Sequence, residues 1–287
     1  MRKPLQFGLI ALILSVFAIN TEAQSPDRPQ PTLDTDDADA RDEQMRELVS
    51  TITVRDLSDG SVDARTAELM PQPLVRYSDQ QRRFPDATLW GWELDGRPVA
   101  FSKLERVVNL LDGNLGWQFC LVSLSEGLID ARWEGRESWR ASKRGVAWND
   151  LTGAPQPHRS ENGRLVQMKA LARQFEAVII NPELEQRERM RLLPTPILRY
   201  SSAPHNVIDA GIFGFTSKGT NPDTLLLIEL QGSDNEPAWK YAVVGMTGDA
   251  VTVERGGQSV WTKDSTPGPG DYDNWDWRVD WDSPDSG

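Results

Sequence analysis

The sequence predicts an α+β fold of two tandem repeats, each an amphipathic helix followed by a mainly antiparallel, curved sheet of about five or six strands. The first observation is a decapeptide, Leu69–Ser78, whose pattern Leu-x-Pro-x-Pro-x-x-Arg-Tyr-Ser recurs at Leu192–Ser201. The second is that the spacing of apolar residues changes after the opening segment of each copy, from the helical period of 3.6 residues to the strand period of two. A helix followed by strands, without βαβ alternation, is typical of the α+β class.

The first 23 residues have the features of a secretory signal peptide. Arg2 and Lys3 precede an apolar run over residues 5–19, and Ala23 ends the segment at a position that a signal peptidase accepts. The run is shorter than the roughly 20 residues that span a bilayer. We therefore expect export to the periplasm or the extracellular space after cleavage near Ala23, with no membrane span in the mature chain.

Composition divides the remainder of the chain. The pattern predicts a flexible, acidic and proline-rich leader (24–42), a first repeat (43–141), a linker (142–163), a second repeat (164–263) and an acidic, tryptophan-containing tail (264–287). The tail alternates loosely between aromatic and acidic residues. It is expected either to add as a strand to this protein's sheet or to a partner, or to be a disordered end.

Net charge restricts the partners. The formal charge of −12 becomes −13 once Arg2, Lys3 and Glu22 are removed with the signal peptide. An acidic protein repels nucleic acid phosphates, so we expect no nucleic acid partner. Cys120 is the single cysteine, which rules out an intramolecular disulfide, and we interpret it as a small buried residue.

Each predicted repeat opens with one apolar helix face. In the first repeat Met45, Leu48, Val49 and Ile52 have the spacing i, i+3, i+4, i+7. In the second, the same spacing continues from Met168 as far as Ile179, and Asn162 is the expected N-cap.

The strands follow as segments matched between the repeats: Asp86–Trp92 with Asp209–Phe215, Pro98–Glu105 with Pro222–Glu229, and Trp117–Val122 with Trp239–Val244. The apolar run Thr224–Ile228 predicts a central strand covered on both faces. The strand from Trp239 is also apolar on both faces. We expect one face to lie under the helix and the other against a second layer, which is either the sister repeat or the same sheet folded back on itself.

Residues that match in both repeats are interpreted as structural, because a chain seldom needs the same active site twice while both copies need the same packing. We expect each Arg–Glu set to form an ion pair across neighbouring strands, and the aromatic pairs to belong to the core. The matched pairs are Arg76 and Arg199, Glu105 and Glu229, Tyr77 and Tyr200, Trp117 and Trp239, and Trp139 and Trp261.

Tryptophans without a counterpart are the candidate binding residues, since exposed aromatic rings stack on sugar rings or peptide side chains. They are Trp92, Trp133, Trp148, Trp275, Trp277 and Trp281. The sequence contains no nucleophile elbow, P-loop, Rossmann fingerprint or His-Glu-x-x-His motif, and only two histidines. We expect no metal and no cofactor, and the catalytic residues of any enzyme activity are not predicted.

The shared string Leu-x-Pro-x-Pro-x-x-Arg-Tyr, then Pro-x-x-Leu-Leu-x-Ile-Glu, then Trp-x-Tyr, complete from Leu192 to Tyr241, resembles a family of exported bacterial proteins of uncharacterised function. The resemblance implies export and assigns no activity or functional residue.

The favoured function is a non-enzymatic binding or scaffolding protein whose partner is an envelope or extracellular protein or polysaccharide. The alternative is an envelope or extracellular hydrolase that uses carboxylate acid–base chemistry in a groove between the repeats.

Overall fold

The chain is mostly β, so the predicted α+β class with two helix-plus-sheet repeats is wrong. The computed structural model describes residues 38–57, 64–79, 82, 84–108, 115–134, 138–181, 186–233, 236–266 and 268–281. It is 55% strand and 12% helix, and the strands form four antiparallel sheets. The described α-helices are α1 (Ala38–Ser50) and α2 (Glu161–Ala172). All described residues belong to the unit Asp36–Gly287, so the predicted signal peptide lies outside them.

The physical reason for the difference is how the strands next to each helix pair. The strand directly after α1 pairs with a late strand, β1 with β8, and the strand after α2 does the same, β11 with β18. Each pairing closes a small separate sheet instead of extending one curved sheet. The predicted helical spacing also ran too far in both repeats, because Ile52 begins strand β1 and Phe175–Asn181 is strand β11.

The first half of the unit holds one large and one small sheet. The large sheet has the order β20-β21-β7-β6-β5-β3, with β4 also on β5, and the small sheet has the order β2-β1-β8-β9. The strands are β1 (Ile52–Asp56), β2 (Arg65–Thr66), β3 (Glu68–Leu69), β4 (Val75–Asp79), β5 (Phe84–Leu94), β6 (Arg97–Val108), β7 (Leu115–Ser123), β8 (Ile129–Trp133), β9 (Trp139–Arg140), β20 (Gly270–Asp271) and β21 (Trp275–Trp281).

The second half also holds a large and a small sheet. The orders are β10-β17-β16-β15-β13, with β14 also on β15, and β12-β11-β18-β19. The strands are β10 (Asn149–Asp150), β11 (Phe175–Asn181), β12 (Gln186–Arg189), β13 (Arg191–Leu192), β14 (Leu198–Ser202), β15 (Val207–Thr216), β16 (Thr224–Gln231), β17 (Ala238–Gly245), β18 (Ala250–Arg255) and β19 (Gln258–Lys263). A 3₁₀ turn spans Ala203–His205.

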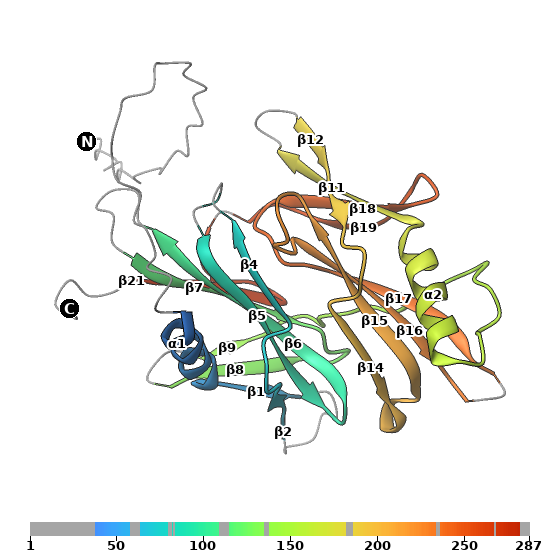
Figure 1. Ribbon diagram of the computed structural model, residues 1–287, viewed down its shortest axis with the longest axis horizontal. Coiled ribbons are helices and arrows are strands. Elements are labelled where there is room, and N and C mark those ends of the chain that lie inside the picture. Colours follow the sequence, from blue (N-terminus) through green and yellow to red (C-terminus); the bar gives the residue numbers. More distant parts are fainter. Residues whose placement is uncertain are drawn as a thin grey trace, which may run out of the picture. The chain divides into compact units, whose positions relative to one another are not determined.

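Three hydrophobic clusters separate these layers. One lies between the first large sheet and its small sheet with α1, and a second lies between the second large sheet and its small sheet with α2. The third joins the two large sheets directly, through residues such as Phe101 of β6 and Leu227 of β16. Figure 1 shows α1 and α2 on opposite outer sides of the sheets.

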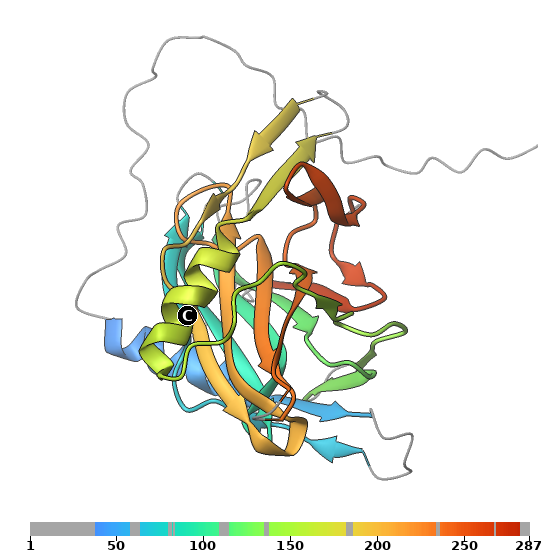
Figure 2. The same ribbon diagram turned by 90° about the vertical axis from the view of Figure 1, so that its right-hand side faces the viewer.

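Successive side chains of a strand point to opposite faces of the sheet, so neighbouring residues of one strand belong to different clusters. On β16, Leu226 and Ile228 face the cluster under α2, whereas Leu225 and Leu227 face the first large sheet. As predicted, β16 is a buried central strand, paired on both sides, and the strand from Trp239 is covered on both faces. Figure 2 shows α2 lying across β15 and β16.

The two Pro-x-Pro segments interrupt the edges of the large sheets. Pro71 and Pro73 lie between β3 and β4, and both of these short strands pair with β5. Proline has no N–H to donate, so the edge strand is divided there. The residues on either side of the second Pro-x-Pro segment pack closely on Gly214, where a Cβ would lie 2.9 Å from Ile197 and 3.0 Å from Leu193.

The predicted boundaries need three adjustments. Helix α1 begins at Ala38, inside the segment expected to be a flexible leader. The N-cap of α2 is Ser160 rather than Asn162, because its hydroxyl accepts a hydrogen bond from the Gly163 N–H at 3.2 Å. The tail forms β20 and β21, and β21 pairs with β7, which selects the first of the alternatives left open for it.

Candidate functional site

The matched tyrosines and glutamates meet, but the matched arginines bind different carboxylates. The Tyr77 hydroxyl donates to Glu105 Oε1 at 2.8 Å, and Tyr200 donates to Glu229. In the first half Tyr77, Ala87 and Glu105 form one row across three strands, so the small alanine lets the hydroxyl reach the carboxylate. The predicted Arg–Glu ion pairs are therefore wrong.

Each matched arginine instead fixes a helix to a sheet. Arg76 donates to Asp86 Oδ2 at 2.8 Å, and Arg41 of α1 donates to the same oxygen at 3.1 Å. The second half has the same arrangement, in which Arg199 and Arg164 of α2 both donate to Asp209 Oδ2 at 2.7 Å. Arg76 lies next to Tyr77 in the chain and so points to the opposite face of the sheet, which is the reason it does not reach Glu105.

The buried glutamates also bind residues of the opposite half. Arg97, the first residue of β6, donates to Glu229 Oε1 at 3.1 Å and to Oε2 at 3.0 Å. In the other direction, Asn221 donates to Glu105 at 3.2 Å. Both glutamate side chains are at most 1% exposed, so these bonds connect the two large sheets inside the protein.

A second connection involves Asp223, which is fully buried. Arg82 of the first half donates to Asp223 Oδ1 at 2.7 Å, and the ammonium of buried Lys103 donates to the Met246 carbonyl at 2.8 Å. Burial would raise the pKa of Asp223, but the positive charges of Lys103 and Arg82 outweigh it and hold this pKa below its ordinary value. The carboxylate is therefore ionised and paired.

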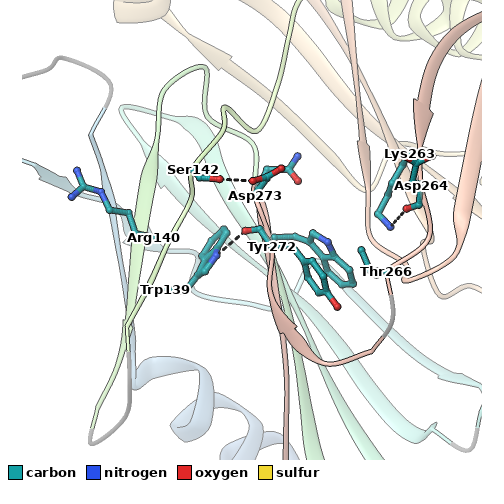
Figure 3. Close-up of a pocket in the computed structure, with 10 residues that line it drawn as sticks. Trp139, Arg140, Ser142, Lys263, Asp264, Thr266, Tyr272 and Asp273 are labelled. Carbon is teal, nitrogen blue, oxygen red and sulfur yellow. Dashed lines mark hydrogen bonds between the residues drawn. The ribbon is translucent and has the colours of Figure 1, made fainter. Parts of the chain in front are cut away.

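A groove between the linker and the tail is open to ligands and is formed by two cavities that share Asn274. The first cavity has a volume of about 550 Å³. Figure 3 shows Trp139 and Ser142 on one side of it, Lys263 and Asp264 on the other, and Tyr272 between them. The Trp139 indole N–H donates to the Tyr272 carbonyl at 3.0 Å, which fixes the tail against β9.

The aromatic rings of the tail stack on one another beside this cavity. Tyr272 and Trp275 are 5.1 Å apart between centroids with 15° between planes, and Trp277 continues the stack at 6.0 Å. The Lys263 ammonium lies 5.2 Å from the Trp275 centroid, and burial lowers the pKa of Lys263. The cavity thus combines apolar rings with a cation held over one of them.

The second cavity, about 530 Å³, continues the groove toward the second half. Its aromatic lining comes from Trp148 of the linker, Tyr241 of β17 and Trp261 of β19. The Trp148 Nε1 is buried and has no hydrogen-bond partner. A buried indole N–H usually donates to an acceptor, so this wall offers one unused donor.

The six candidate tryptophans are not in one place. Trp92 and Trp133 belong to the cluster under α1 and line neither cavity of the groove. Trp148 and Trp275 line the groove, and Trp277 stacks behind Trp275. The backbone of Trp281 ends β21, while its side chain lies outside the described residues.

The aromatic residues assigned to the core divide in the same way. Trp117 and Trp239 are buried in the two outer clusters, as expected. Trp139 and Trp261 also pack on these clusters, yet each lines one cavity of the groove. A matched position was taken as evidence for the core alone, and this missed both groove residues together with Tyr272.

Within the described residues, no three or more histidine, cysteine, aspartate or glutamate side chains gather as they would around a metal ion. In the same part of the chain, no helix has the length and apolar character needed to cross a membrane. No family model, curated protein or solved structure matches the chain.

Proposed function

We propose that this protein is an exported, non-enzymatic binding protein and that the linker–tail groove holds its ligand. The observation that carries the proposal is that six aromatic side chains converge on two adjoining cavities. Concave surfaces with aromatic walls and a few polar groups are where proteins most often bind ligands. The aromatic residues are Trp139, Tyr272 and Trp275 in the first cavity, and Trp148, Tyr241 and Trp261 in the second.

The origin of the groove supports a functional role. The linker and the tail, which have no counterpart elsewhere in the sequence, supply many of its lining residues, from Ser142 to Asn149 and from Tyr272 to Trp275. The strands with matched residues supply the frame. Segments that the packing of the two halves does not require are thus free to bind a partner.

The carboxylates around the groove do not favour the hydrolase alternative. Hydrogen bonds from Lys143 and Ser142 lower the pKa of Asp273, whereas a general acid needs a raised pKa. Glu126, in the second cavity, pairs with Arg97 at 3.2 Å. Glu105 and Glu229 line neither cavity. We therefore propose binding, or scaffolding through binding, in preference to catalysis.

The amino-terminal sequence supports a location for this activity. Arg2, Lys3 and the apolar run before Ala23 are typical of a cleaved signal. The partner is then an envelope or extracellular protein or polysaccharide.

The test uses the mature chain, residues 24–287, in isothermal titration calorimetry against soluble envelope polysaccharides and envelope peptides. Trp261→Ala and Tyr272→Ala each remove one aromatic wall, and we expect each to weaken the ligand found by about tenfold or more. Val166→Ala, which removes an exposed side chain of α2 that lines neither cavity, is the control and leaves affinity unchanged. Equal affinity of all three variants and the parent would refute the groove as the site.

A further inference from the structure

The outer edges of β7 and β17 have the same side-chain pattern but are covered to different extents. The patterns are Trp117-x-Phe119-x-Leu121 on β7 and Trp239-x-Tyr241-x-Val243 on β17. Strand β21 pairs with β7 at every residue from Gly116 to Val122. Strand β10 pairs with β17 only at Lys240 and Tyr241. The β17 edge beyond Tyr241 therefore lacks the cover that its counterpart has.

The direction of the free backbone groups follows from two hydrogen bonds. Successive residues of an antiparallel strand direct their N–H and C=O groups to alternate sides. The Met246 N–H donates to the Asp223 carbonyl on the β16 side, and the Trp239 carbonyl accepts from the Leu151 N–H on the β10 side. Odd-numbered residues of β17 thus face the β10 side.

Val243 and Gly245 are the odd-numbered residues beyond the reach of β10. In the described part of the chain, no backbone hydrogen bond joins either of them to a residue on that side. Both residues are buried, and Val243 is 6% exposed. A strand edge whose backbone N–H and C=O groups have no strand partner is a template for pairing with another chain. On β7, the matching Ser123 N–H donates to the Asn274 carbonyl.

The linker leaves this edge open because it is held elsewhere. Asn149 pairs with Tyr241, but the N–H groups of Gly145 and Val146 both donate to the Ser125 carbonyl of the first half, at 2.9 and 3.2 Å. The linker therefore departs from β17 before Val243. The second cavity of the groove lies at this place and is lined by the linker and by Val243.

We propose that the Val243–Gly245 edge of β17 is a strand-addition site that binds an extended peptide. This inference rests on the proposed function and names its ligand class. An extended peptide supplies N–H and C=O groups at the spacing of a strand, as β21 does on β7. A polysaccharide has no such ladder of alternating donors and acceptors, so the backbone groups of Val243 and Gly245 favour a peptide.

The cavity also sets a side-chain preference. A peptide residue opposite Val243 projects to the same face of the sheet as Val243. Tyr241 and Trp261 line the cavity on this side. The site therefore favours an apolar or aromatic residue at this position over the aspartate that β21 places opposite Leu121 of β7.

The probe is a fluorescein-labelled synthetic peptide with the sequence of Asn274–Trp281, in which leucine replaces the residue corresponding to Asp276. Antiparallel pairing as in β21 places this leucine opposite Val243 and the residue corresponding to Asn274 opposite Gly245. One derivative is N-methylated at these two residues, which removes the amides that face β17. A matched derivative is N-methylated at the residues corresponding to Trp275 and Trp277, whose amides face away. Anisotropy with the mature chain gives the affinities.

We expect the first derivative to bind at least about tenfold more weakly than the probe, and the second to bind within about twofold of it. Amide hydrogen exchange locates the site, since the probe should protect Val243 and Gly245 and leave Leu121 and Ser123 unchanged. Equal binding of both derivatives, or no protection at Val243 and Gly245, would overturn the inference. A polysaccharide whose binding Trp261→Ala abolishes would overturn it while leaving the groove as the binding site.

Discussion

Arg97→Met tests the connection between the two large sheets. The Arg97 side chain is 11% exposed and the Glu229 side chain is fully buried, so this substitution leaves a carboxylate inside the protein without its cation. Removing one partner of a buried ion pair costs about 3–5 kcal/mol. Tyr200 and Gln231 still donate to Glu229, which favours the lower end of that range. We expect a loss of about 3 kcal/mol in the free energy of unfolding.

The assay is urea denaturation of the mature chain, followed by near-ultraviolet circular dichroism. With an m-value of about 3 kcal/mol/M, the midpoint should fall by about 1 M. Arg76→Met is the matched control, because the Arg76 side chain is 40% exposed and Arg41 remains on Asp86. This exposed pair should contribute less than about 1 kcal/mol.

A double substitution separates the ion pair from general packing. Glu229→Gln removes the charge that needs Arg97, so Arg97→Met with Glu229→Gln should be more stable than Arg97→Met alone. If Arg97→Met costs no more than Arg76→Met, or if the double variant is the least stable, the reasoning about the buried carboxylate is refuted.

Three further predictions concern buried residues. The pKa of Asp223 in the folded protein is below its unfolded value of 3.8. Its contribution to stability is therefore complete above pH 3.8 and is lost as the pH falls through the native pKa. In urea denaturation between pH 2 and 6, Asp223→Asn should reduce the fall of the unfolding midpoint at low pH. Burial raises the pKa of Cys120 to about 12, so a disulfide reagent at pH 8 should modify it only in the unfolded chain, and prompt reaction of native protein would contradict its position. Gly214→Ala should lower stability by about 1–3 kcal/mol in thermal unfolding, since the added Cβ meets Ile197 and Leu193, and an unchanged melting temperature would contradict that close packing.

Much of the second large sheet was predictable from local pattern. The apolar run at Thr224–Ile228 has too few polar positions for a half-exposed strand, and β16 is indeed buried between two neighbours. The two apolar faces of the strand from Trp239 required a second layer, which the other large sheet supplies. These inferences succeeded because burial on both faces leaves a direct trace in the sequence.

The fold class was not predictable from the same pattern. Phe175 and Ile179 fit the spacing of a helix that starts at Met168, but they also alternate with polar or exposed positions as a strand does. Val178, Ile179 and Ile180 are β-branched and favour a strand, and this preference decides the structure. Pairing of this strand with β18, far along the chain, creates the small sheet that no local window shows.

The site was partly predictable. The absence of a counterpart identified Trp148 and Trp275, which line the groove, but it also selected Trp92 and Trp133, which are buried. A tryptophan can lack a counterpart because the two halves pack differently at that position, and not only because it binds a ligand. Tyr272, between the two sides of the first cavity, gives no sequence signal of its own and is placed there by the pairing of β20 with β21 and by the hydrogen bond from Trp139 to its carbonyl.

The most direct test of the account is amide hydrogen exchange of the ligand-free mature chain at the two matched strand edges. If the linker leaves β17 open, the Val243 and Gly245 amides should exchange at least about tenfold faster than Leu121 and Ser123, whose edge is covered by β21. Equal protection at the two edges would mean that the linker closes over β17 in solution, and it would contradict the claim that this edge is open to a peptide.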